Sequence, residues 1–280
     1  MFLRRKLTVM ATVALLSTSL LAGCSSSGEN SNGGSNGGGT ATAAEVLANK
    51  NARAAISMII DKQAYCDVIL NNGSIPTSTF TPKGLAFDNG KDYTDLTEGY
   101  EYNEEQAKEL WEKAKEEVGF DTVEMELLTY DHDTGKRTGE YIQSELSDLE
   151  GLTVKVSNLP FKQKLERETN GEFDLAFSGW GADYPDPLTY LSTMQTGNQF
   201  SNQVGYNSEE YNKLIEEAMK LPITEGYAKY AEAEKLMLED GYLAPIYQKA
   251  SAYLEKDYVS GIVNNSWGAD YTYTYADVDK

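Results

Sequence analysis

The chain has 280 residues, of which 44 are acidic and 24 basic, and its net charge is −20 at neutral pH. So acidic a surface repels phosphate backbones and anionic lipid, which argues against a protein that binds nucleic acid or a membrane through charge. The length allows one or two domains with a sizeable core.

The first 24 residues have the pattern of a secretory signal. A basic start at residues 4–6 precedes an apolar run that is well short of the ~20 residues needed to span a bilayer. Leu21-Ala22-Gly23-Cys24 resembles the lipobox of bacterial lipoproteins, in which the cysteine is lipidated and becomes the new N-terminus. We therefore expect a signal peptide over residues 1–24 and a chain anchored through Cys24 to the extracytoplasmic face of a bacterial cell membrane. The alternative is an ordinary signal cut near a chance cysteine.

A low-complexity segment follows the predicted signal. Residues 25–40, SSSGENSNGGSNGGGT, carry no apolar side chain, so we expect a disordered tether over residues 25–42 and a folded part over residues 43–280. Cys66 would be the only thiol left after lipidation. No intrachain disulfide is therefore expected, and Cys66 is interpreted as a buried helix residue.

The first half of the predicted folded part begins with helices. Residues 43–70 show helical spacing with a break at Asp61, and a loop rich in glycine and proline follows up to about residue 85. Residues 104–119 predict an amphipathic helix that starts at Asn103 and ends at Gly119.

Strands and helices then alternate, which is the clearest indication of fold class. We predict strands over residues 123–130, 152–159 and 173–180, with helices near 137–149 and 161–168 between them. This order is typical of right-handed crossovers, and it predicts an α/β fold with a largely parallel sheet flanked by helices. Further along, the sequence predicts helices over 208–221 and 224–240, extended structure over 243–254, and a last strand over 271–278 with one face made of Tyr271, Tyr273 and Tyr275.

The stretch GWGADYPDP, residues 179–187, stands where a buried strand must end. Ligands of open α/β sheets bind beyond the carboxyl ends of the strands, so this turn is the candidate site. Gly179 and Gly181 let a ligand approach the backbone, Trp180 offers an apolar face, and Asp183 offers a carboxylate to a cation. Structural roles compete with these: Trp180 as a core residue, and Asp186 as a helix cap or turn former.

The sequence gives little support for an enzyme or for a metal site. Asp183 and Asp186 could be imagined as the acid pair of a glycosidase, but nothing in the sequence fixes their separation. Asp131, His132 and Asp133 suggest a metal, yet the acids that a calcium loop needs are missing, so the segment is better interpreted as a polar loop. No nucleophile set can be assembled. We expect no catalytic residue, no metal and no cofactor.

The order of three motifs resembles a known family. NARAAISMIIDKQAY, GSIPTSTFTPKGL and FDLAFSGWGADYPDPLTYLSTM follow one another as in the solute-binding proteins of oligopeptide and dipeptide ABC importers, called family 5. The likeness runs from about residue 49 to about residue 275. It implies the C-terminal lobe of a type II periplasmic-binding-protein clamp, in which an extended peptide bonds through its main chain.

The resemblance also implies roles for residues of the turn. The family's aspartate falls on Asp183, where it would pair with the peptide's α-ammonium. Gly179, Trp180, Gly181 and Tyr184 would line the ligand. Some members have an arginine that binds the ligand's carboxylate at the position that Phe177 occupies here. Either another cation binds the C-terminus of the peptide, or the site does not select peptide length at that end.

Family members are about twice as long, so the resemblance implies a chain without the N-terminal lobe, which a separately encoded chain could supply. The expected partners are an oligopeptide and ABC permease subunits, and nucleic acid is not among them. In the family the last strand returns to the first lobe. Without that lobe the C-terminal tyrosines would lack a packing partner, so we expect them to be prone to association or poorly ordered. The alternative function is a surface lipoprotein that scaffolds or senses, or a relic of a transport protein.

Overall fold

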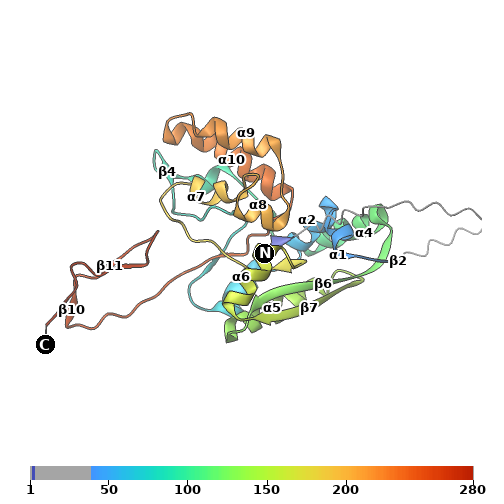
Figure 1. Ribbon diagram of the computed structural model, residues 1–280, viewed down its shortest axis with the longest axis horizontal. Coiled ribbons are helices and arrows are strands. Elements are labelled where there is room, and N and C mark those ends of the chain that lie inside the picture. The colour runs from blue at the N-terminus through green and yellow to red at the C-terminus, as the bar shows by residue number, and fades with distance from the viewer. Residues whose placement is uncertain (1, 4–38, 280) are drawn as a thin grey trace, which may run out of the picture.

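The computed structural model describes residues 2–3 and 39–279 (Figure 1). The predicted lipidation site, Cys24, and most of the predicted signal and tether lie outside the described residues. The predicted end of the tether at residue 42 is wrong, because residues 39–41 form a strand of the sheet and Thr42 caps the first helix. In the part of the chain that is described, no helix combines the length and the apolar character that crossing a membrane requires.

A five-stranded sheet forms the lower half of the molecule in Figure 1. Its central strand, β6 (Phe120–Tyr130), pairs in parallel with β7 (Leu152–Leu159) along one edge. Along the other edge it pairs in parallel with β2 (Gly39–Ala41) and β8 (Leu175–Ala176). The short strand β1 (Phe2–Leu3) pairs antiparallel with β8. The predicted α/β class with a largely parallel sheet is confirmed.

Helices cover the sheet and form a second layer above it. In chain order they are α1 (Ala43–Leu47), α2 (Lys50–Met58), α3 (Lys62–Ala64), a π-helix (Tyr65–Leu70), a 3₁₀ turn (Tyr93–Leu96), α4 (Glu104–Val118), α5 (Asp133–Leu146), α6 (Phe161–Asn170), α7 (Leu188–Leu191), a 3₁₀ turn (Ser192–Met194), α8 (Gln199–Val204), α9 (Glu209–Ala218) and α10 (Ile223–Glu239). Two further antiparallel strand pairs form within the connecting segments. They are β3 (Ile75–Pro76) with β9 (Tyr247–Gln248), and β4 (Phe87–Asp88) with β5 (Lys91–Asp92).

One hydrophobic core lies between the sheet and helices α1, α2, α4 and α5. The predicted amphipathic helix is α4: the Asn103 side chain accepts a hydrogen bond from the Gln106 N–H, and Gly119 ends the helix with φ +82°. Trp111 of α4 is fully buried, packs edge-on against Phe120 at 5.5 Å, and donates through Nε1 to the Glu150 carbonyl. Cys66 is buried, as predicted.

A second core joins helices α7 to α10 and the loop of residues 80–93. Glu234 of α10 is fully buried there, and its carboxylate accepts hydrogen bonds from the N–H groups of Phe80 and Thr81 and from the Tyr93 hydroxyl. These bonds satisfy a group that would be costly to bury alone, and they fix the glycine- and proline-rich loop against α10. The two cores position the turn that follows β8 between them.

Three predicted elements differ from the structure. The break at Asp61 is confirmed, but the helical stretch breaks once more at Asn49, whose side chain caps α2. The strand predicted over residues 173–180 is regular only at Leu175–Ala176, because the chain leaves the sheet directly afterwards. The single strand predicted over residues 271–278 is wrong: β12 (Tyr271–Thr272) and β13 (Asp277–Val278) are separate strands with a turn between them.

The last residues form an arm that extends away from the two cores (Figure 1). It comprises residues 251–279, and we call it the C-terminal arm. Within it β10 (Val259–Ser260) pairs with β13, and β11 (Val263–Asn264) pairs with β12. Each pair is only two residues long, so the arm has little internal support.

Candidate functional site

The candidate site is the turn that begins where β8 ends. The carboxyl ends of β6, β7 and β8 meet at one edge of the sheet, since the three strands are parallel. The Phe177 N–H donates to the Leu128 carbonyl at 2.9 Å, and this is the last bond of the β8 ladder. Residues 178–187 then leave the sheet and lead to α7. The turn thus lies where an open α/β sheet binds its ligand.

Two hydrogen bonds to Thr189 of α7 anchor the turn. The Trp180 indole Nε1–H donates to the Thr189 carbonyl at 2.9 Å, and the Asp183 N–H donates to Thr189 Oγ1 at 3.0 Å. Trp180 also packs edge-on against Phe200 at 5.4 Å. It is half-buried and packs against the second core, as the structural interpretation expects, and its ligand-facing role stays a prediction.

The other predicted ligand-binding residues are exposed. Gly179, Gly181, Asp183 and Tyr184 all face solvent. In the described part of the chain, the N–H groups of residues 179–181 donate to no acceptor and the Asp183 carboxylate accepts no hydrogen bond. The turn therefore offers free main-chain donors beside a free carboxylate, which suits a ligand that has main-chain acceptors and a positive charge.

Asp186 has the turn-forming role that competed with a functional one. Its Oδ1 accepts a hydrogen bond from the Leu188 N–H at 2.9 Å, directly at the start of α7. Burial raises the pKa of this half-buried carboxyl. Because Asp186 is tied to the helix while Asp183 faces solvent, the structure gives no support to the two as an acid pair across a sugar.

A row of aromatic rings lies at the same edge of the sheet. Tyr130, the last residue of β6, stacks on His132 at 5.4 Å and on Phe161 at 6.2 Å. His132 caps α5, since its Nδ1 accepts a hydrogen bond from the Gly135 N–H. Among the described residues no three His, Cys, Asp or Glu side chains are grouped as metal ligands. Phe161 is 63% exposed and adds an apolar surface at this edge of the sheet.

Sequence reasoning missed Thr189, Phe161 and a buried cluster made of Lys164, Glu168 and Ser178. The segment Pro185-Asp186-Pro187 could have indicated the role of Thr189. Two prolines around an acid predict a turn, and a turn brings the residues that follow it back toward Trp180 and Asp183. Phe161 follows Pro160 directly after a predicted strand, which also places it at the ligand edge. Lys164 and Glu168 carry no such indication, because a Lys and a Glu four residues apart on a helix usually form a solvated pair.

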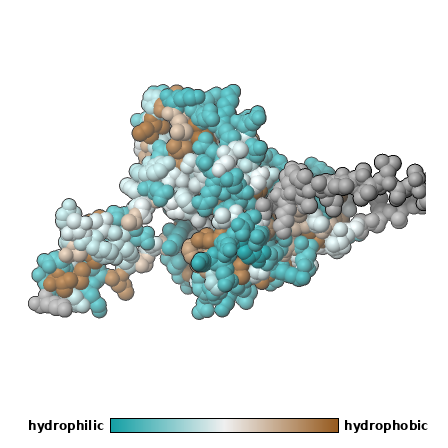
Figure 2. All heavy atoms as spheres, viewed as in Figure 1, coloured by the Kyte–Doolittle hydropathy of each residue, from teal (hydrophilic) through white to brown (hydrophobic). Residues whose placement is uncertain are grey.

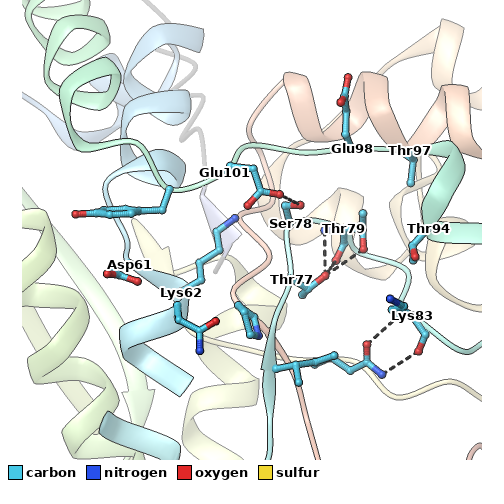
Figure 3. Close-up of a pocket in the computed structure, with 15 residues that line it drawn as sticks. Asp61, Lys62, Thr77, Ser78, Thr79, Lys83, Thr94, Thr97, Glu98 and Glu101 are labelled. Atoms are coloured by element: carbon cyan, nitrogen blue, oxygen red, sulfur yellow. Dashed lines mark hydrogen bonds between the residues drawn. The ribbon is translucent and has the colours of Figure 1, made fainter. Parts of the chain in front are cut away.

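A hollow lies elsewhere, beside α3 and the loop of residues 75–79 (Figure 3). Its volume is about 500 Å³, and none of the predicted ligand-binding residues lines it. Hydroxyl and carboxylate groups surround it, and its buried amine, Lys62, donates to the Tyr100 carbonyl. The labelled residues in Figure 3 include Ser78, which donates to the Glu101 carboxylate. Within the lining, Thr77 bonds to Thr79 and Lys83 bonds to Gln248 as well, whereas the buried Thr97 hydroxyl has no hydrogen-bond partner among the described residues.

Comparisons with known proteins identify the family of this chain. Residues 28–202 match the family described as bacterial extracellular solute-binding proteins, family 5 Middle. This chain belongs to that family. It is 32% identical over 237 residues to the dipeptide-binding protein of Lactococcus lactis subsp. cremoris, a match that covers 82% of this chain and 43% of the relative. The chain spans less than half the length of the curated relatives it matches, and those relatives are named as binding proteins.

Solved structures show the same fold. Listeria monocytogenes OppA bound to peptide superposes with a TM-score of 0.77 at 37% identity, and the match covers 84% of this chain and 46% of that one. A second structure, a peptide-binding protein of a peptide ABC transporter, superposes with a TM-score of 0.69 at 36% identity. That match covers 74% of this chain and 93% of the other, so it takes in nearly all of a shorter chain.

Proposed function

We propose that this chain binds oligopeptides outside the cytoplasm and delivers them to the permease of an ABC importer. The observation that carries the proposal is the free Asp183 carboxylate beside the free N–H groups of residues 179–181, at the carboxyl edge of a family 5 sheet. The peptide's α-ammonium would pair with Asp183, and its first carbonyls would accept from the turn. Trp180, Tyr184 and Phe161 would contact its side chains.

The anchoring and the partners belong to the same proposal. A diacylated Cys24 and a tether over residues 25–38 would hold the folded part, which begins at β2, at the extracytoplasmic face of the cell membrane. A second polypeptide that supplies the N-terminal lobe would cover the exposed turn and exclude water from the Asp183 pair. Without such cover the charge pair is screened by solvent and contributes little.

The proposal is tested by calorimetric titration of the full chain with a pool of tri- to pentapeptides. We expect binding that weakens up to about fivefold in Asp183→Asn, which is ~1 kcal/mol, because a charge-assisted bond to the ammonium becomes a neutral one while solvent screens the pair. Acetylating the peptides at the N-terminus should weaken binding to the parent by a similar factor and add little further loss in the variant.

The matched control is Asp95→Asn, which removes an equally exposed acid far along the chain from the turn. It should bind peptides as the parent does, because only long-range attraction changes. Equal affinity of parent and Asp183→Asn would remove Asp183 from the site, and no heat from a folded parent would contradict peptide binding by this chain.

A further inference from the structure

Two charged residues of α6 face the interior instead of solvent. The side chain of Lys164 is fully buried and that of Glu168 is 3% exposed. Lys162 and Glu166, spaced identically on the same helix, are both exposed. The buried pair is therefore specific to the face of α6 that meets the sheet.

The buried pair is bonded to the residue that precedes the candidate turn. Lys164 Nζ forms an ion pair with Glu168 Oε1 and donates to Ser178 Oγ at 2.7 Å. The Ser178 hydroxyl in turn donates to Glu168 Oε1 at 2.5 Å. Lys164 Nζ also lies 4.4 Å from the centroid of the Tyr130 ring, with which it forms a cation–π contact. We call the buried Lys164 and Glu168, together with the half-buried Ser178, the buried triad.

Stability alone does not account for the buried triad. Removing two charges from water costs several kcal/mol each, and well-packed apolar residues of the same volume are often as stable as a buried ion pair. What distinguishes the triad is its place. Phe177 makes the last ladder bond of β8, Ser178 comes next, and the unbonded N–H groups of residues 179–181 follow. The triad holds the chain at the point where it turns out of the sheet.

We infer that Lys164 and Glu168 are positioning residues for ligand binding: through Ser178 they fix the direction in which the chain leaves β8, and with it the main-chain donors of the turn. The effect on affinity rests on the proposed peptide binding, whereas the effect on the turn does not. Lys164 also contacts Tyr130, whose ring supports Phe161, so the triad holds the turn and the aromatic row in one arrangement.

The test replaces the pair by apolar residues in the full chain, as Lys164→Met/Glu168→Leu, and the matched control replaces the exposed pair, as Lys162→Met/Glu166→Leu. Both variants should melt at or above the temperature of the parent. The readout in the absence of ligand is the indole N–H resonance of Trp180, which reports its bond to Thr189. Trp111, bonded to the Glu150 carbonyl, is the internal reference.

We expect the Trp180 resonance to shift or broaden in the triad variant only, while the Trp111 resonance stays in place. Peptide affinity should fall at least tenfold in the triad variant, equally for peptides with a free and an amidated C-terminus. Ser178→Ala keeps the ion pair and cuts its link to β8, so it should show the same change in the Trp180 resonance even if the double variant folds poorly.

Each other outcome is decisive. An unchanged Trp180 resonance and unchanged affinity in a folded triad variant would overturn the inference. A loss confined to peptides with a free carboxylate would also overturn it, because Lys164 would then bind the ligand directly. If the parent binds no peptide, the proposed function fails, and the Trp180 resonance alone decides whether the triad positions the turn.

Discussion

Lys62 shows how a single buried amine can make stability depend on pH. Its side chain is 4% exposed, and Nζ donates to the Tyr100 carbonyl rather than to a carboxylate. Burial lowers the pKa of Lys62 to about 8, although the nearby charge of Glu101 opposes this change. The folded chain therefore holds mainly the neutral amine above a pH of about 8, whereas the unfolded chain keeps its proton up to a pH of about 10.4.

The sign of the pH effect follows from this difference. The contribution of Lys62 to stability is complete above the unfolded pKa and is lost as the pH falls through about 8. Raising the pH from 8 to 10 should thus increase the free energy of unfolding, by about 2 kcal/mol relative to Lys62→Met. Urea denaturation at several pH values measures this.

Cys66 acts in the opposite direction and must be controlled. Burial raises the pKa of its thiol to about 11, so its contribution to stability is lost as the pH rises through that value. The comparison is therefore made in a Cys66→Ala background. The same pH dependence in the presence and absence of Lys62 would show that this amine stays charged in the folded chain.

At the scale of elements, α5 approaches the sheet closely through a glycine. A Cβ atom on Gly139 would lie 2.5 Å from Val156 Cγ1 of β7 and 3.3 Å from Thr129 Cγ2 of β6. Gly139→Ala should destabilise the chain by about 1–3 kcal/mol, although alanine is the better helix former by about 1 kcal/mol. Glu140→Ala, at the exposed neighbouring position, should change stability by less than about 0.5 kcal/mol. Equal stability of Gly139→Ala and the parent would mean that α5 can shift outward without loss.

The elements that the sequence predicted well are those with a local pattern. Both α4 and β7 follow from apolar periodicity and end groups. The length of β8 and the single last strand were wrong, because the point where a strand leaves its sheet depends on partners distant in sequence. The buried triad depends on such contacts too: only the fold brings Ser178 to Lys164, and nothing local distinguishes Lys164–Glu168 from the exposed Lys162–Glu166 pair.

At the scale of the whole molecule, the two cores are held by packed apolar side chains, whereas the C-terminal arm has little such packing. Neither core contains a residue beyond Tyr247. The arm instead exposes large aromatic side chains, with Tyr275 at 75% and Tyr273 at 61%, and its surface is pale with teal and brown patches in Figure 2. One backbone bond joins it to the candidate turn: the Gly268 N–H donates to the Ala182 carbonyl at 2.8 Å.

Trypsin should therefore remove the arm before it cuts either core. Lys256 lies in an exposed, irregular stretch, so early cleavage there is expected to leave a body that melts at the same temperature as the intact chain. The intact chain should also self-associate at tens of micromolar in sedimentation, and the trimmed body should not, because exposed aromatic residues and unpaired strand edges favour association. Mass spectrometry identifies the fragments. If residues 265–280 stay uncut while the cores are digested, the arm is held more firmly than its contacts indicate, and the bond from Gly268 to the turn becomes the first contact to examine by substitution.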